Sequence, residues 1–271
     1  MRKILFIFLI LCLLSFPVEA GTPYTSKPPL GSQIDWGHPL SKGLVGCWLF
    51  NEGGGAIVNK LCNNYPSNLT SYSWKRKIVK SNGDAFRMGF QNLPVFYNIG
   101  NYTIILKMKE DEDIWDAGQS RPLAYFQSGN PLVYISFGKQ KTIWAERADD
   151  GNGYSETTGN TAMSKTTLNV FGIVKNIGNG TLNFYFDGNP DGSYSGKITS
   201  IIHTGSCPIT IFGNAGWATL RGEIEYLYIF NQALSTSQIR QLYIEPYCFI
   251  KSSPITNWVP SVPPTGFGQV I

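Results

Sequence analysis

The chain has 271 residues, of which 14% are aromatic and 15% are charged, and its formal net charge is +4. A positive charge this small, without a basic stripe, does not favour nucleic acid as a partner. After the first twenty residues there is no long apolar run, so the sequence predicts no membrane-spanning segment in the mature protein.

The N-terminus has the pattern of a secretory signal peptide. Arg2 and Lys3 precede an apolar run at residues 4–14, and small residues lead up to a cleavage site before Gly21. The run is too short to span a bilayer comfortably. We therefore expect residues 1–20 to be removed and the mature protein to be secreted, into the extracellular space or a periplasm.

The next segments predict an arm, a strand and a loop. Residues 21–42 contain four prolines and predict an extended arm that packs on the surface. Residues 43–55 open with a strand that is apolar on both faces, one with Leu44, Trp48 and Phe50, the other with Val45, Cys47 and Leu49. Residues 59–82 are polar and rich in turn residues, which predicts a long loop.

Short β-rich runs bounded by turn residues follow, at 84–90, 102–109, 123–127, 132–137, 142–147, 168–175, 182–187 and 208–213. In the run 102–109 we expect the even-numbered residues from Tyr102 to Met108 to point inward, and Thr103, Lys107 and Lys109 to point outward. Gly178-Asn179-Gly180 predicts a hairpin turn. This spacing is typical of an antiparallel sandwich.

Residues 222–243 change from a strand period to a helix period. Residues 222–231 predict a strand covered on both faces. Ser235 and Gln238 have the spacing of a capping box, and Leu234 and Ile239 that of a hydrophobic staple. They predict a short helix at about 236–244, which ends before Pro246.

GEIEYLYIFNQALSTSQIRQLY resembles the closing strand and helix of the laminin-G-like jelly-roll domains in the concanavalin A-like lectin/glucanase superfamily. The matching residues are Gly222, Ile224, Ile229, Asn231, Ala233, Leu234, Ser235, Ile239, Leu242 and Tyr243. GLVGCWLFNEGGG and LNFYFDG resemble the opening strand and a hairpin of that family. The resemblance implies an all-β, antiparallel two-sheet jelly roll at 43–250, whose first and last strands pair. It also implies that Asp187 is a turn residue. Residues 251–271 are rich in proline, which predicts a tail.

Four cysteines remain in the mature chain, and they allow three disulfide pairings among which the residues alone do not choose. The resemblance implies Cys47 with Cys248 and Cys62 with Cys207, since it brings the first strand near the end of the chain. Buried thiols are the alternative.

Catalytic patterns are missing from the sequence. Glucanases of this superfamily carry alternating carboxylates on one strand, and the only acidic cluster, residues 110–113 with Asp116, lacks that spacing. There is no Gly-x-Ser-x-Gly motif, and His38 and His203 both lie in turn-like segments. We predict no catalytic residue and no enzyme activity.

Binding residues are easier to nominate, because sugars are held by aromatic rings together with amide and carboxylate groups. Trp217 and Asn214 in a glycine-containing loop are the main candidates, and Trp115 and Tyr154 are further ones. Calcium is the one cofactor left open, with oxygen ligands from Asp149, Asp150 and Asn152. The alternatives are rings that cover the sandwich edge and ordinary turn residues.

The sequence thus predicts a secreted, non-catalytic recognition module that binds a glycan or a surface glycoconjugate. A structural component of a cell-surface or virion assembly is the second interpretation, and a glycoside hydrolase the third.

Overall fold

The computed structural model describes residues 26–54, 57–58, 67–70, 72–75, 78–81, 87–90, 98–110, 121–127, 132–138, 141–147, 154–162, 166–195, 201–202, 209–211 and 222–251. The expected signal peptide at 1–20 and all but the first residue of the expected tail at 251–271 lie outside these ranges. Among the described residues, no helix is both long and apolar enough to cross a membrane.

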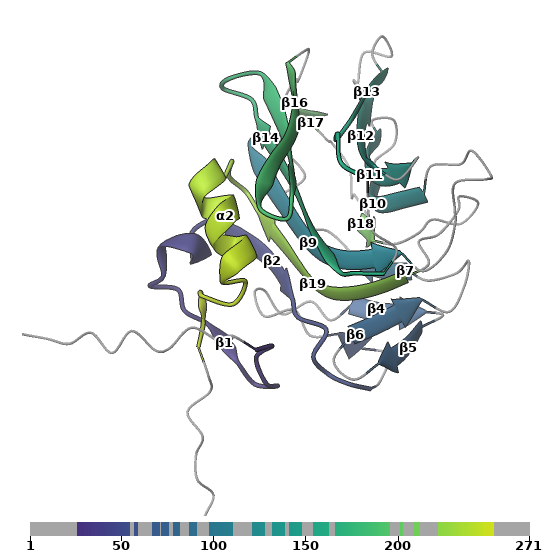
Figure 1. The fold of residues 1–271 in the computed structure, drawn as a ribbon, viewed down its shortest axis with the longest axis vertical. Helices are drawn as coiled ribbons and strands as arrows, with labels where there is room; N and C mark the ends of the chain where they lie inside the picture. Colours follow the sequence, from purple (N-terminus) through teal and green to yellow (C-terminus); the bar gives the residue numbers. More distant parts are fainter. Residues whose placement is uncertain are drawn as a thin grey trace, which may run out of the picture.

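Two eight-stranded antiparallel sheets form the body of the molecule (Figure 1). Sheet I contains, in spatial order, β16 (Asn189–Ser195), β15 (Thr181–Phe186), β14 (Asn169–Asn176), β9 (Tyr102–Glu110), β19 (Gly222–Phe230), β6 (Ile78–Ser81) and β5 (Tyr72–Lys75), with β2 (Leu44–Trp48) also against β19. Sheet II contains β13 (Tyr154–Thr158), β12 (Lys141–Arg147), β11 (Leu132–Gly138), β10 (Arg121–Gln127), β18 (Ile209–Ile211), β7 (Arg87–Phe90), β4 (Ser67–Thr70) and β3 (Ile57–Val58).

Short elements complete the architecture. A two-stranded sheet joins β1 (Gln33–Ile34) to β20 (Ile250–Lys251), and another joins β17 (Ile201–Ile202) to β8 (Asn98–Ile99). The helices are the 3-10 turn η1 (Pro39–Ser41) and α2 (Thr236–Ile244). Together these elements confirm the predicted all-β, two-sheet jelly roll with one short α-helix.

The first and last long strands pair, as the resemblance implies. In the antiparallel register of β2 and β19, Trp48 lies opposite Leu227 and Cys47 lies opposite Tyr228. On its other side β19 pairs with β9. Because β19 has a strand on each side and layers on both faces, eight of its nine residues are buried.

The loop expected at residues 59–82 is wrong, because this part of the chain contains three strands. β4 pairs with β7 in sheet II, and β5 and β6 form a hairpin that extends sheet I. β6 pairs with Glu223 and Ile224 of β19. Backbone hydrogen bonds to β7 and β19 therefore stabilise strands in this polar segment.

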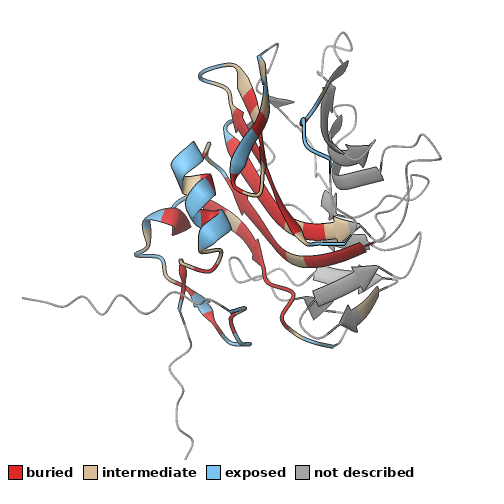
Figure 2. Ribbon diagram, in the orientation of Figure 1, coloured by how far each residue is buried: buried red, intermediate tan, exposed pale blue. Residues whose placement is uncertain are grey.

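The outer face of sheet I is covered, and not open to solvent. Figure 2 shows β2, β9, β14 and β19 of this sheet largely buried, while α2 is exposed on its outward side. Thr103, expected to point outward to solvent, is fully buried, and its hydroxyl donates to the Gln232 carbonyl at 2.8 Å and accepts from the Leu234 amide at 2.9 Å. The predicted alternation of this strand is confirmed, but a second layer of the protein covers the face that was expected to point outward.

A bulge changes the expected faces of β2. The register with β19 shifts between Ile229 and Phe230, so that Leu44 joins the same outer cluster as Cys47 and Leu49, although the alternation put it opposite them. A bulge inserts an extra residue on one strand and reverses the alternation beyond it.

Helix α2 follows the predicted capping pattern. The Ser235 hydroxyl accepts from the Gln238 amide at 3.3 Å, and the Gln238 side chain accepts from the Ser235 amide at 2.9 Å. Leu234 and Ile239 are both buried in the cluster between the helix and sheet I. The capping box thus fixes where the helix starts, and its apolar face secures it to the sheet.

Candidate functional site

Most of the ligand-binding candidates lie outside the described residues: Trp115, Asp149, Asp150, Asn152, Asn214 and Trp217. Tyr154 is the exception, because its backbone forms the first residue of β13. The strands that precede and follow each segment nevertheless fix which candidates belong to the same end of the sandwich.

Two segments that each contain a tryptophan connect to sheet I at neighbouring strand ends. Residues 111–120 follow β9, and residues 212–221 precede β19. In the β9–β19 register, Glu110 at the end of β9 lies opposite Gly222 at the start of β19. The two segments therefore join sheet I at neighbouring residues.

The same two segments also meet sheet II at neighbouring strands. Residues 111–120 lead into β10 and residues 212–221 follow β18, and Ala124 of β10 lies opposite Ile211, the last residue of β18. The strand ends that flank the segments of Trp115, Asn214 and Trp217 therefore lie at one end of the sandwich, which we call the tryptophan end.

Tyr154 belongs to the opposite end of sheet II. β11 ends and β12 begins at the tryptophan end, beside the start of β10. There Gly138 of β11 lies opposite Lys141 of β12. β12 then runs seven residues away from that end to Arg147, which lies opposite Tyr154. At the usual rise of a strand, this places the Tyr154 backbone about 20 Å from that end.

The candidate cation ligands Asp149, Asp150 and Asn152 fall in the sequence between β12 and β13. Their side chains lie outside the described residues. Within the described ranges, no three His, Cys, Asp or Glu side chains gather as a metal site would require.

The predicted disulfide between Cys47 and Cys248 is not present, because the structure records both residues as thiols. Cys248 packs against the outer cluster to which Cys47 belongs. Burial raises the pKa of the Cys248 thiol to about 11, so it stays protonated at neutral pH, and a protonated thiol is a poor nucleophile. Cys62 and Cys207 lie outside the described residues.

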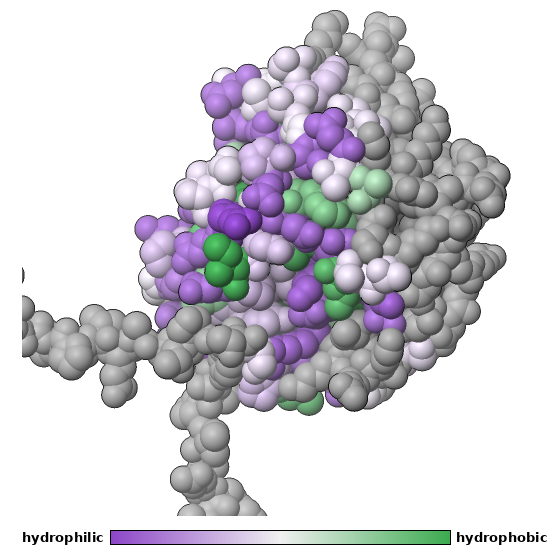
Figure 3. Space-filling view, in the orientation of Figure 1, coloured by the Kyte–Doolittle hydropathy of each residue, from purple (hydrophilic) through white to green (hydrophobic). Residues whose placement is uncertain are grey.

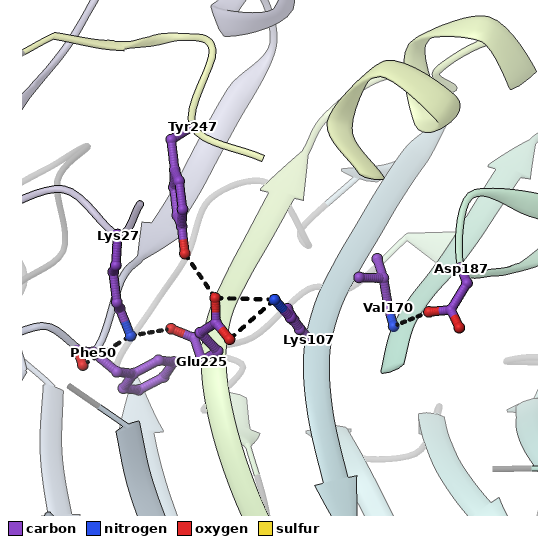
Figure 4. A network of polar contacts seen from close by, with 7 residues as sticks. All are labelled: Lys27, Phe50, Lys107, Val170, Asp187, Glu225 and Tyr247. Atoms are coloured by element: carbon purple, nitrogen blue, oxygen red, sulfur yellow. Dashed lines mark hydrogen bonds and ion pairs between the residues drawn. The ribbon is translucent and has the colours of Figure 1, made fainter. Parts of the chain in front are cut away.

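The described residues contain a polar network centred on Glu225, which the sequence reasoning missed (Figure 4). The Glu225 carboxylate accepts from Lys107 Nζ at 3.1 Å and from the Tyr247 hydroxyl at 2.9 Å. Burial, followed by the charge of Glu225, raises the pKa of Tyr247 well above its ordinary value, so the hydroxyl keeps its proton and donates. The sequence signal was a glutamate on β19 and a lysine at an outward position of β9.

Lys27 extends the network into the arm. Its ammonium group donates to the Glu225 carbonyl at 2.7 Å and to the Phe50 carbonyl at 3.1 Å. Phe50 has a φ of 49°, an unusual value for a residue with a side chain, and the Asn51 side chain donates to the Pro28 carbonyl at 2.9 Å. The network therefore fastens the arm and the Tyr247 segment to sheet I.

A second acid on β19 also has a lysine partner on β9. Glu223 is buried and lies 3.5 Å from Lys109 Nζ. Glycoside hydrolases need one carboxyl group that can donate a proton and a second that can attack or activate water. Glu223 and Glu225 are instead each engaged by a lysine, which suits a structural role.

Asp187 is a turn residue, as the resemblance implies. Asp187 and Gly188 have φ values of 47° and 75°. The Asp187 carboxylate accepts from the Val170 amide at 2.8 Å and from the Asn169 side chain at 2.9 Å. His38, expected to lie in a turn-like segment, caps η1 by accepting from the Leu40 amide at 3.2 Å.

Comparison with known proteins gives one family match. A family model described as the concanavalin A-like lectin/glucanases superfamily matches residues 80–240. No curated protein matches the chain.

Several solved structures have a similar fold. A sialidase of Trypanosoma rangeli in complex with sialic acid is 16% identical with a TM-score of 0.54, and the match covers 75% of this chain and 33% of the sialidase. A mutant of HCR/D is 14% identical with a TM-score of 0.60, covering 76% and 52%. The receptor binding domain of a botulinum neurotoxin C/D mosaic serotype is 12% identical with a TM-score of 0.57, covering 74% and 51%.

The chain therefore spans about a third of the sialidase and about half of the other two proteins. At these identities the similarity concerns the fold, and one fold supports many functions.

Proposed function

This chain belongs to the concanavalin A-like lectin/glucanases superfamily, and on that basis we propose that it is a secreted, non-catalytic recognition module that binds a glycan or a surface glycoconjugate. The observation that supports the proposal is that the strand ends flanking segments 111–120 and 212–221 are neighbours in both sheets. We propose that Trp115 and Trp217 gather at this end. The sugar would be bound there.

The residue types at the tryptophan end suit a sugar. A pyranose has apolar C–H faces, which stack on aromatic rings, and hydroxyl groups, which need hydrogen-bond partners. Trp217 and Trp115 supply rings and Asn214 supplies an amide that both donates and accepts. The backbone of Tyr154 lies at the other end of sheet II, so the proposed site does not include Tyr154 or the acidic residues that precede it.

The outer face of sheet I is unsuited to a ligand. Apolar residues of the arm, α2 and the segment after it share one buried cluster with β19, including Leu40, Leu242 and Phe249. The surface over α2 is mainly hydrophilic with small separate apolar spots (Figure 3). This coverage favours the loops at the end of the sandwich over the sheet face.

The lysine partners of Glu223 and Glu225 support the non-catalytic part of the proposal. Each carboxylate is already engaged by a lysine of β9, in an ion pair that joins two neighbouring strands of sheet I. Export rests on residues 1–20. Sequencing of the secreted protein should find Gly21 as its first residue, and an intact Met1 would contradict the proposed cleavage.

Binding is tested with residues 21–271 on a glycan array, followed by titration of a soluble form of each glycan retained. Trp217→Ala and Trp115→Ala should each lower affinity at least tenfold, or about 1.4 kcal/mol. Tyr154→Ala is the matched control, since it removes an aromatic ring at the opposite end, and its affinity should stay within about twofold of the unmodified protein. Retention of no glycan, or equal binding by the tryptophan variants, would refute the proposal.

A further inference from the structure

One exposed aromatic ring lies far from these loops in sequence, on a turn of the arm. Trp36 is 60% exposed. The turn is closed by the His38 amide, which donates to the Asp35 carbonyl at 3.0 Å, and by the Gly37 amide, which donates to Asp35 Oδ1 at 3.1 Å. The Asp35 amide donates to the Phe249 carbonyl at 2.8 Å, which ties the turn to the C-terminal segment.

These bonds matter because a turn whose backbone is already ordered loses little backbone freedom when a ligand binds to it, and the entropic cost of association falls accordingly. Tyr243 is the other aromatic residue among the exposed large hydrophobic side chains of the described chain. Its ring has the Arg240 guanidinium 5.4 Å from its centroid. No cation–π or ring partner is recorded for Trp36 among the described residues.

Asp35 and His38, which lie on either side of Trp36 in the sequence, supply one hydrogen-bond acceptor and one hydrogen-bond donor. Asp35 Oδ1 accepts from Lys251 Nζ at 2.8 Å, and this bond with that of Gly37 lowers the pKa of Asp35, so the carboxylate stays charged. Its Oδ2 has no recorded partner in the described part of the chain. His38 accepts the Leu40 amide through Nδ1, so in the neutral ring Nε2 carries the proton and can donate.

We propose that the Trp36 turn is a second sugar-contacting site, in which a pyranose stacks on the indole while Asp35 Oδ2 accepts from one hydroxyl and His38 Nε2–H donates to another. This inference rests on the proposed function and extends it to a second part of the surface. An apolar protein partner fits less well, because it would take the Asp35–Lys251 ion pair out of water without replacing its hydration.

The test compares Trp36→Ala with Trp36→Phe on the same array, and with Trp217→Ala beside them. Trp36→Phe keeps an aromatic face and Trp36→Ala removes it, and because the side chain is exposed, both should unfold at the temperature of the unmodified protein. Trp36→Ala should lower affinity for at least one retained glycan about tenfold, and Trp36→Phe less than threefold.

The outcomes separate the two proposals. Loss of binding in Trp217→Ala with none in Trp36→Ala would overturn the second site and leave the first. Loss in Trp36→Ala alone would support the Trp36 site and move binding away from the tryptophan end. Retention of no glycan would overturn both. Self-association of the unmodified protein that Trp36→Ala abolishes, without a change in glycan binding, would assign the ring to a contact between copies and overturn the inference.

Discussion

Two stacked tyrosines on β19 allow a sharp test of how the outer layer is stabilised. The rings of Tyr226 and Tyr228 are 4.7 Å apart and nearly parallel, and both side chains are fully buried. The Tyr228 hydroxyl donates to the Pro246 carbonyl at 2.9 Å. The Tyr226 hydroxyl is buried without a hydrogen-bond partner among the described residues.

The same substitution should therefore have opposite effects at the two positions. Tyr226→Phe removes a hydroxyl that lost water and gained no partner, a state that costs about 1–3 kcal/mol, so we expect it to stabilise the fold by about 1 kcal/mol. Tyr228→Phe removes a hydrogen bond and leaves the Pro246 carbonyl without its donor, so we expect a loss of about 1–2 kcal/mol. Both variants keep the stacked rings and their apolar contacts.

Urea unfolding followed by tryptophan fluorescence measures both changes, with equal slopes as the check that both unfold in the same way. In a domain of this size 1 kcal/mol corresponds to about 2–4 °C in Tm, so the two variants should differ by roughly 5–10 °C. Equal destabilisation by the two variants would refute the reasoning, since it would mean that the Tyr226 hydroxyl has a partner.

Three further predictions concern the network, a sheet edge and acid stability. Glu225→Ala should lower the free energy of unfolding by about 2–3 kcal/mol, less than the loss of a fully buried ion pair would, because the lysine partner of Glu225 is partly exposed. Glu225→Gln should lower it by less, and unfolding titrations will measure both changes. Gly159→Ala should destabilise by about 1 kcal/mol or more, since a Cβ there would collide with the Asp191 carboxylate, which the Thr161 amide holds at 2.8 Å. Gly54→Ala meets nothing within 4 Å and should be neutral, and equal Tm values would contradict this. The pKa of Asp35 is lowered from 3.8 in the folded protein, so the contribution of this carboxylate to stability is present above that pH and is lost as the pH falls through the lower folded value. Asp35→Asn should therefore lose less stability between pH 6 and pH 3 than the unmodified protein. An equal loss in the two proteins would contradict the assignment.

Local signals in the sequence were sufficient for the closing strand and its helix. The alternation in β19, the capping box at Ser235 and the stop before Pro246 act within a few residues of each other, and the structure reproduces them. The pairing of β2 with β19 is a long-range contact, and it was accessible only through the resemblance to a family.

Other features depended on what packs against a strand. Thr103 obeys the strand period, yet the period cannot say whether the second face meets water or another layer. The segment 59–82 has too few apolar residues to indicate strands, and its strands exist because neighbouring edges were available. Leu44 changed faces because of a bulge, which leaves no mark in the order of apolar and polar residues.

The candidate site likewise combines features that the sequence predicted with features that depend on the fold. The sequence identified Trp115, Trp217 and Tyr154 by residue type and by nearby glycines, but only strand register shows that the strand ends flanking the two tryptophan segments lie at one end and the Tyr154 backbone at the other. Glu225 escaped notice because its partners come from β9 and from the segment after α2. Trp36 escaped notice because its exposure depends on the turn that holds it.

The short sheet of β1 and β20 brings residues near the two termini together, with Ile34 opposite Ile250 and Asp35 bonded to Lys251. A larger protein that joined this domain at Gln33 and Lys251 would keep the two connections a single strand spacing apart, about 5 Å. Such a junction would replace the arm before Gln33, and with it the bonds that Lys27 makes to the Glu225 and Phe50 carbonyls.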